Sequence, residues 1–304
     1  MSLKTTKSLF SFIILVFSGV LSAQTITSFT PTVVTQRSVV VITGTGFTGT
    51  TAANVKFGGV SATAITVNSN TQITATVGAA ASGNVTVTNG GTATLAGLTY
   101  VAPAATNATT SGVTRIVTNF DGYWNSAAVS TNSLLQPDTN HSLLAFQYGG
   151  VMYSTGSVTA TNTLNSNGVA FTAGNYRSLP IKNVTGNVGT DNNFIVLGSK
   201  IDGNPNGQTA TAPAVVGLSV RDVLIDGIRG LDLGTGVTNL PASAVLTFTA
   251  SNIVSAGIND AVPDILVSQI AEPTDNSYSI YMFIDNNGNI VGNPVQVALN
   301  SITA

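Results

Sequence analysis

Apolar and polar residues alternate along the first third of the chain. Ile73, Ala75 and Val77 alternate with polar residues, and Val85 and Val87 repeat the pattern. A period of two places every second side chain on one face of a β-sheet. Turn-forming Gly and Asn residues recur at intervals of about 8–15 residues, which is typical of an all-β sandwich. The pattern predicts a β-sandwich domain over residues 25–101, with no helix.

Residues 102–112 are rich in Pro, Ala, Thr and Asn, and this composition predicts a linker. The pattern changes after it. Beyond it, residues 113–304 contain longer apolar runs. Residues 141–156 predict a hairpin that turns at Gly149-Gly150, and residues 277–302 predict another with its tip at 286–289. Residues 218–234 have apolar positions at helical spacing after Ser219. We therefore expect an all-β second domain, a larger β-sandwich or jelly roll, with one short helix.

The segment that includes Val41-Ile42-Thr43-Gly44-Thr45-Gly46-Phe47, followed by Val55-Lys56-Phe57-Gly58-Gly59, resembles the IPT/TIG family of immunoglobulin-like domains. The later stretches 73–75, 83–87 and 98–100 continue the resemblance. The resemblance implies that Gly44 and Gly46 adopt backbone angles that β-branched residues cannot adopt, and that the Phe47 side chain fills the core. Arg37-Ser38 stands where the family often has a glycine pair. In bacterial exported proteins such domains are usually spacers or interaction modules without catalytic residues.

The N-terminal residues 1–23 have the three parts of a signal peptide. Lys4 and Lys7 precede an apolar stretch from Leu9 to Leu21, and Ala23 supplies the small residue at the cleavage site. The apolar stretch is shorter than the roughly 20 residues that a membrane span needs. The chain has no cysteine, so it carries neither disulfides nor a lipidated N-terminal cysteine. These features predict a bacterial protein that is exported, soluble after cleavage, and not a lipoprotein.

Charged residues are unusually rare. Asp, Glu, Lys and Arg make up 7% of the chain, and the net charge is −2, whereas soluble domains have about 25% charged residues. The chain has no basic cluster, which excludes the electrostatic footprint of a nucleic-acid-binding protein. A surface covered by Thr, Asn, Ser and Gly is common on bacterial cell-surface modules that assemble with other proteins or contact polysaccharide.

One segment could hold a metal ion. Asp202, Asn204 and Asn206 match the first half of a D-x-N-x-N-G calcium loop, in which oxygen ligands at alternate positions wrap one cation. The twelfth position is Pro213, where the calcium loop needs a bidentate glutamate. A calcium site and a plain polar loop are both open interpretations, and no other cofactor is expected.

Catalytic groups are sparse. His141 is the only histidine and stands at the start of a predicted strand, and no G-x-S-x-G motif occurs. A glycosidase needs two nearby carboxylates. The spaced pairs are Asp222/Asp226 and Asp260/Asp264, and Glu272 is the only glutamate. We assign no catalytic residue and predict a protein that is not an enzyme.

Tyr123 and Trp124 form the candidate ligand-binding pair, because Trp124 is the only tryptophan and has Asn and Asp neighbours. An exposed aromatic ring beside amides suits stacking on a sugar ring. A core tryptophan of a β-sandwich is the alternative interpretation.

Residues 113–304 resemble, more loosely, modules in large secreted surface proteins of gliding Bacteroidetes such as flavobacteria. The stretches that carry this resemblance are 118–126, 143–156 and 226–241. Such proteins usually end in a sorting domain for type 9 secretion, so the resemblance leaves open whether residue 304 is the natural C-terminus. We predict a non-catalytic, exported cell-surface protein for adhesion or extracellular assembly, whose partners are itself, other surface proteins or polysaccharide. The alternatives are a carbohydrate-binding accessory protein and, third, a glycan-degrading enzyme.

Overall fold

The computed structural model describes residues 23–106, 112–128, 141–185, 194–197, 225, 227–233, 235–238, 244–250, 260, 262–268 and 277–298. The chain divides into two compact units. Unit 1 comprises residues 1–104 and 282–294, and unit 2 comprises residues 105–281 and 295–304. Apart from Ala23, the predicted signal peptide lies outside the described residues. The described part of the chain contains no helix that is long and apolar enough to cross a membrane.

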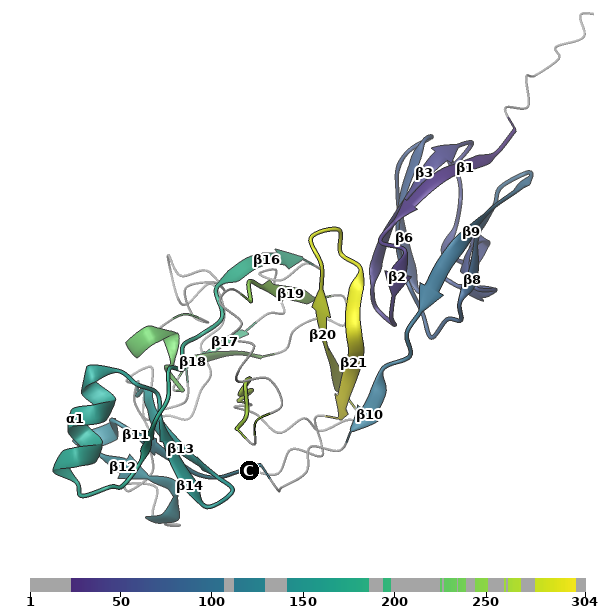
Figure 1. Cartoon of the computed structure of the whole chain (residues 1–304). Helices are drawn as coiled ribbons and strands as arrows, with labels where there is room; N and C mark the ends of the chain where they lie inside the picture. The colour runs from purple at the N-terminus through teal and green to yellow at the C-terminus, as the bar shows by residue number, and fades with distance from the viewer. Residues whose placement is uncertain are drawn as a thin grey trace, which may run out of the picture. The chain divides into compact units, whose positions relative to one another are not determined.

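Unit 1 contains two β-sheets that face each other (Figure 1). The first sheet has the order β1-β3-β7-β6, with β1 at Thr25–Thr30, β3 at Val39–Thr45, β7 at Gln72–Thr76 and β6 at Ala64–Ser69. The second has the order β2-β9-β8-β4-β5, with β2 at Val33–Val34, β9 at Thr92–Tyr100, β8 at Gly83–Thr88, β4 at Val55–Phe57 and β5 at Val60–Ser61. A short 3-10 helix, η1, spans Ala52–Asn54. The predicted all-β class is confirmed.

The core of unit 1 follows the alternation seen in the sequence. Buried side chains from both sheets form one cluster: Phe29, Val34, Val40, Ile42, Phe47, Val55, Phe57, Ala62, Ile73, Ala75, Val77, Val85, Val87 and Leu98. The Phe47 side chain is completely buried, which confirms its predicted role as a plug of the core.

The two glycines before Phe47 are required for different reasons. Gly46 has a φ of 77°, a left-handed conformation that favours glycine. Gly44 is not in that region, so the prediction that both glycines take special backbone angles is wrong for Gly44. A Cβ atom at Gly44 would collide with the carbonyl oxygen of Thr25 on β1 and would lie 2.7 Å from Phe47 Cζ. Gly44 therefore lets β1 and the Phe47 ring approach the strand closely.

Residues 282–294 of unit 1 include the tip of a β-hairpin formed by β20 (Tyr278–Ile284) and β21 (Ile290–Ala298). The hairpin was predicted, and its tip is confirmed at residues 285–289. Asn289 Oδ1 accepts hydrogen bonds from the backbone N–H groups of Thr32, at 2.8 Å, and Val33, at 3.2 Å. The hairpin tip is thus tied to the first residue of β2 and to the residue before it. Together with β10 (Ala104–Thr106), which lies in the predicted linker, the hairpin forms a sheet of order β10-β21-β20.

Unit 2 is built around a five-stranded sheet of order β12-β11-β13-β14-β15. Its strands are β12 at Trp124–Asn125, β11 at Val113–Thr118, β13 at Leu143–Tyr148, β14 at Val151–Ser154 and β15 at Thr172–Ala173. Two strand pairs join β16 (Ile181–Thr185) to β19 (Val245–Phe248) and β17 (Phe194–Leu197) to β18 (Thr235–Thr238). The predicted hairpin turn at Gly149-Gly150 is confirmed, since both residues have positive φ angles between β13 and β14.

The described part of unit 2 contains the α-helix α1, at Val158–Ser166, which was not predicted from the sequence. Ser157 Oγ accepts a hydrogen bond from the Ala160 N–H at 3.0 Å and so caps the helix. Ala160 and Leu164, one turn apart, are buried against the sheet in a cluster with Val117, Leu144, Ala145 and Met152. Three short 3-10 helices complete the described part of the unit, at Phe120–Gly122, Ser126–Ala128 and Ile228–Gly230.

The helix predicted within residues 218–234 lies mostly outside the described residues. The described end of that segment is not α-helical. It forms the 3-10 turn at Ile228–Gly230, in which Arg229 has a left-handed φ of 56°. Glycines on both sides of Ile228 and Arg229 allow this sharp turn.

Candidate functional site

Tyr123 and Trp124 lie at the edge of the five-stranded sheet. Trp124, on the outer strand β12, pairs with Thr118 of β11 and is half-buried. Tyr123 is also half-buried and packs against the core cluster of unit 2, while its hydroxyl oxygen is 3.5 Å from the Asn125 Nδ2 donor. Partial burial at a sheet edge suits neither a fully packed core residue nor an open stacking platform. The role of this pair in sugar binding stays a prediction.

The other residues singled out from the sequence do not form a catalytic or metal centre in the described region. Asp202, Asn204 and Asn206 lie outside the described residues, as do Asp222, Asp226 and Glu272. His141 is buried and makes an edge-to-face contact with Phe120, with ring centroids 6.4 Å apart. Within the described residues, no group of three His, Asp or Glu side chains could hold a metal ion. The calcium loop therefore stays a prediction.

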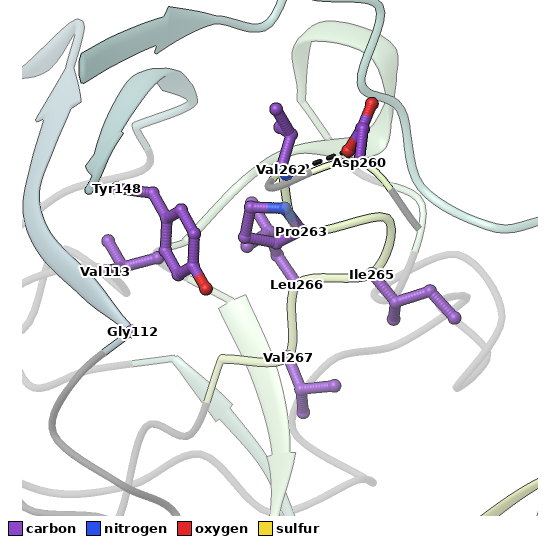
Figure 2. Close-up of a pocket in the computed structure, with 9 residues that line it drawn as sticks. All are labelled: Gly112, Val113, Tyr148, Asp260, Val262, Pro263, Ile265, Leu266 and Val267. Carbon is purple, nitrogen blue, oxygen red and sulfur yellow. Dashed lines mark hydrogen bonds between the residues drawn. The ribbon is translucent and has the colours of Figure 1, made fainter. Parts of the chain in front are cut away.

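A cavity of about 370 Å³ lies beside Tyr148, the last residue of β13, and we call it the Tyr148 pocket. Figure 2 shows the Tyr148 ring facing Pro263, with Val113 beside the ring. The described residues that line the cavity are mostly apolar: Gly112, Val113, Tyr148, Asp260, Val262, Pro263, Ile265, Leu266 and Val267. Asp260 contributes a carboxylate, of which one oxygen accepts a hydrogen bond from the Val262 N–H at 2.8 Å. An apolar wall with one aromatic ring and one carboxylate can hold the less polar face of a ligand.

Tyr176 holds one wall of the Tyr148 pocket in place. Its hydroxyl donates to the carbonyl oxygen of Pro263 at 2.9 Å, and its ring packs edge-on against Phe146, with centroids 4.9 Å apart. Burial raises the pKa of the Tyr176 hydroxyl, and the nearby carboxylates of Asp264 and Asp260 raise this pKa further. The hydroxyl therefore stays protonated at neutral pH and remains a hydrogen-bond donor.

Apolar side chains are also exposed on the β20–β21 hairpin. Phe283 is 52% exposed, Val291 is 54% exposed and Tyr281 is 39% exposed. The Asp285 N–H donates to the Asn289 carbonyl oxygen at 2.9 Å, and continuing this pairing places Phe283 opposite Val291. Tyr281 precedes Phe283 by two residues and so points to the same face of the strand. We call these three residues the hairpin face.

The hairpin that carries this face is fixed by its turn. Asp285 accepts hydrogen bonds from the backbone N–H groups of Asn287 and Asn289, at 2.8 and 2.9 Å, and from the Asn289 side chain at 3.0 Å. These bonds hold the pKa of the Asp285 carboxyl below its usual value of 3.8. This tip was predicted from the sequence as a hairpin turn. The exposed face beside it was not predicted, because the alternation of apolar and polar residues does not tell which face is covered.

The family model of the IPT/TIG domain matches residues 25–102, so the resemblance drawn from the sequence is confirmed for the first domain. No curated protein sequence matches the chain. Two solved structures from Bacteroides share limited similarity with it. An auxiliary nutrient binding protein from Bacteroides thetaiotaomicron VPI-5482 has 15% identity and a TM-score of 0.23, over 33% of this chain and 23% of that one. SGBP-B from a complex xyloglucan utilization locus in Bacteroides uniformis has 17% identity and a TM-score of 0.22, over 41% of this chain and 37% of that one. The matched regions are thus well under two thirds of either neighbour.

Proposed function

We propose that this chain, an IPT/TIG domain followed by a second β-rich unit, is an exported, non-catalytic surface protein that functions in adhesion or extracellular assembly. The observation that carries the proposal is the hairpin face formed by Tyr281, Phe283 and Val291. Large exposed apolar side chains that gather at one place on a protein mark contact surfaces for other proteins. The IPT/TIG domain supports this role, because such domains act as spacers or interaction modules.

The position of the hairpin face suggests how such a contact forms. Among the described strands, β20 is the outer strand of the sheet β10-β21-β20. Outer strands are usually protected against pairing by lysines, prolines or bulges. The sequence of β20, Tyr-Ser-Ile-Tyr-Met-Phe-Ile, contains no lysine and no proline. We infer that β20 of one copy packs beside β20 of a second copy, or beside a strand of a neighbouring surface protein, and buries Phe283.

The low charge of the chain is consistent with this mode of contact. With 7% charged residues, the surface has little self-repulsion and few ion pairs to form across an interface. A contact based on apolar burial and backbone hydrogen bonds is nearly insensitive to salt, since few charges are screened.

A carbohydrate-binding accessory role is the second candidate. The Tyr148 pocket favours it, because an aromatic ring beside a carboxylate can contact the apolar face and the hydroxyls of a sugar. The half-buried Tyr123-Trp124 pair would add a second aromatic contact.

One experiment separates the two candidates. Self-association of the purified protein and attachment of cells that display it are measured at low and high salt, with and without a soluble neutral polysaccharide, for the wild type and for Trp124→Ala. We expect both quantities to be unaffected by salt, polysaccharide and the substitution. Attachment that is abolished by polysaccharide and by a correctly folded Trp124→Ala variant would refute the assembly role and support carbohydrate binding.

A further inference from the structure

A second cavity of unit 2, of about 340 Å³, is lined among the described residues by Arg177, Ser178 and Arg229. The whole chain has 10 Lys and Arg residues among 304, so two guanidinium groups at one small cavity are a strong local concentration of positive charge. The two arginines are far apart in the sequence, and the fold brings them together.

The Arg229 side chain is held in a fixed position by neutral acceptors. Its Nη1 donates to the Thr155 carbonyl oxygen at 3.0 Å and to Asn175 Oδ1 at 3.1 Å, and its Nη2 donates to the Gly156 carbonyl oxygen at 2.8 Å. A guanidinium has five N–H donors. Described partners use three of them, which leaves the Nε–H and one Nη2–H without a partner among the described residues and open to a ligand.

The backbone fixes Arg177 beside this group. The Ser178 N–H donates to the Arg229 carbonyl oxygen at 3.0 Å. Gly230 permits this close approach, because a Cβ atom there would collide with the Ser178 hydroxyl. The exposed Arg177 side chain has one hydrogen bond within the described region, a 3.5 Å contact to Asn175 Oδ1. Almost all of its donors are therefore available.

The charges of the two arginines are not balanced by acidic side chains in the described region. Neither guanidinium forms an ion pair with a described carboxylate, and both contact the neutral Asn175 side chain. Arginine stays protonated at any physiological pH. Two neighbouring cations that share a neutral acceptor repel each other, and an anion bound between them removes this cost.

We propose that this cavity binds the carboxylate group of an acidic polysaccharide, that is, of a uronic acid residue. The guanidinium fork matches the planar carboxylate and binds it through two parallel hydrogen bonds. Ser178 also lines the cavity, and a serine hydroxyl can form a hydrogen bond with a sugar hydroxyl.

A polysaccharide explains the site better than a protein partner of the same kind. This chain has 12 Asp and Glu residues in 304, so a second copy offers few carboxylates. A polyuronate presents one carboxylate on every sugar, and a cell surface that displays many copies of the protein would bind it multivalently. This choice of ligand rests on the proposed extracellular role, whereas the oxyanion site itself rests on the two arginines alone.

The test is a titration of the full mature protein with trigalacturonic acid at low salt, in which calorimetry measures the binding. Galactotriose is the neutral control. Arg177→Gln is the variant of choice, because Arg177 makes little contact with the fold. Lys56→Gln removes the same charge from an exposed position of unit 1 and is the matched control. We expect Arg177→Gln to weaken trigalacturonate binding by about ten- to a hundredfold, the effect of losing a charge-assisted hydrogen bond. Lys56→Gln should have no effect, and Arg177→Lys should restore part of the affinity.

Several outcomes would overturn the proposal. These are no binding of trigalacturonate, equal binding of galactotriose, or equal losses for Arg177→Gln and Lys56→Gln. Binding of polyglutamate but not of trigalacturonate would replace the polysaccharide by an acidic protein segment. Self-association of the Arg177→Gln variant is measured in parallel. It should be unchanged, so that failure of the uronate site is distinguishable from failure of the hairpin contact.

Discussion

Replacing Phe283 by serine is the most direct perturbation of the hairpin face. Aromatic side chains bury roughly 150–250 Å² each, and Phe283 is 52% exposed, so about 100 Å² of apolar surface is available for a contact. At about 25 cal/mol per Å², its burial contributes about 2.5 kcal/mol. In a two-fold contact between copies the residue counts twice, which gives about 5 kcal/mol, or roughly three to four orders of magnitude in the dissociation constant.

Sedimentation velocity over a range of protein concentrations measures this effect. We expect the wild type to self-associate equally at low and high salt, and Phe283→Ser to remain monomeric. A matched pair of valine substitutions controls for the general loss of apolar surface. Val291→Thr changes the hairpin face, whereas Val158→Thr changes a residue that is 77% exposed on α1. Threonine keeps the branched shape, so both variants should fold.

The hairpin face is not the contact surface if Val158→Thr reduces self-association as much as Val291→Thr, because exposure alone would then account for the effect. Association of Phe283→Ser like that of the wild type, while circular dichroism shows that both proteins are folded, would equally exclude a contact through the hairpin face.

Three further predictions concern Gly44, the hairpin turn at Asp285 and the candidate calcium loop. Gly44→Ala should destabilise unit 1 by about 1–3 kcal/mol through overpacking against β1, seen as a lower melting temperature. Gly91→Ala is the control, because a Cβ there meets open space and Gly91 has no positive φ; if Gly91→Ala has the larger effect, crowding is not the reason for Gly44. Because the pKa of Asp285 is lowered, this carboxylate stabilises the turn fully above pH 3.8, and the stabilisation is lost as the pH falls through the lower pKa of the folded state. The Asn289 amide should stay protected from hydrogen exchange down to that lower pH, and loss of its protection well above pH 3.8 would contradict the prediction. Millimolar calcium should raise the melting temperature of the wild type and not of Asp202→Ala if residues 202–207 bind the ion, and no shift in the wild type would identify a plain polar loop.

The sandwich of unit 1 could be predicted from the sequence because each strand has one buried face. Ile73, Ala75 and Val77 alternate with polar residues and all lie in the core, so a period of two gives both the strand and its orientation. The need for glycine at position 44 could not be predicted for the right reason. It arises from the approach of β1, which is a tertiary contact, and not from the local backbone angle.

The helix α1 shows where the local signals conflict. Its sequence, Val-Thr-Ala-Thr-Asn-Thr-Leu-Asn-Ser, is rich in residues that favour strands and turns. The informative signals were the Ser157 cap and the i, i+4 pair Ala160 and Leu164, which are both completely buried. Two apolar positions are too few to define a helical period by themselves.

The arginine cavity was missed for a different reason. Arg177 and Arg229 belong to separate segments. The helical spacing of residues 218–234 does not predict the 3-10 turn in which Arg229, with its left-handed φ, actually lies. No local pattern predicts such a meeting. The low charge of the chain was the only available signal, because each charged side chain in a charge-poor protein is more informative than in an ordinary one.

Three charged residues of the described region form hydrogen bonds to neutral partners. Asp285 accepts from backbone amides in the hairpin turn, Asp260 accepts from the Val262 amide, and Arg229 donates to two carbonyl groups and one amide side chain. Such short contacts are screened little by salt, whereas attraction between the arginine cavity and a dissolved polyanion acts over a Debye length of about 10 Å at 0.1 M salt. Raising the salt should therefore leave the fold and the hairpin contact intact and weaken uronate binding selectively. Parallel loss of self-association and of uronate binding with rising salt would mean that one electrostatic surface, and not two separate sites, accounts for both.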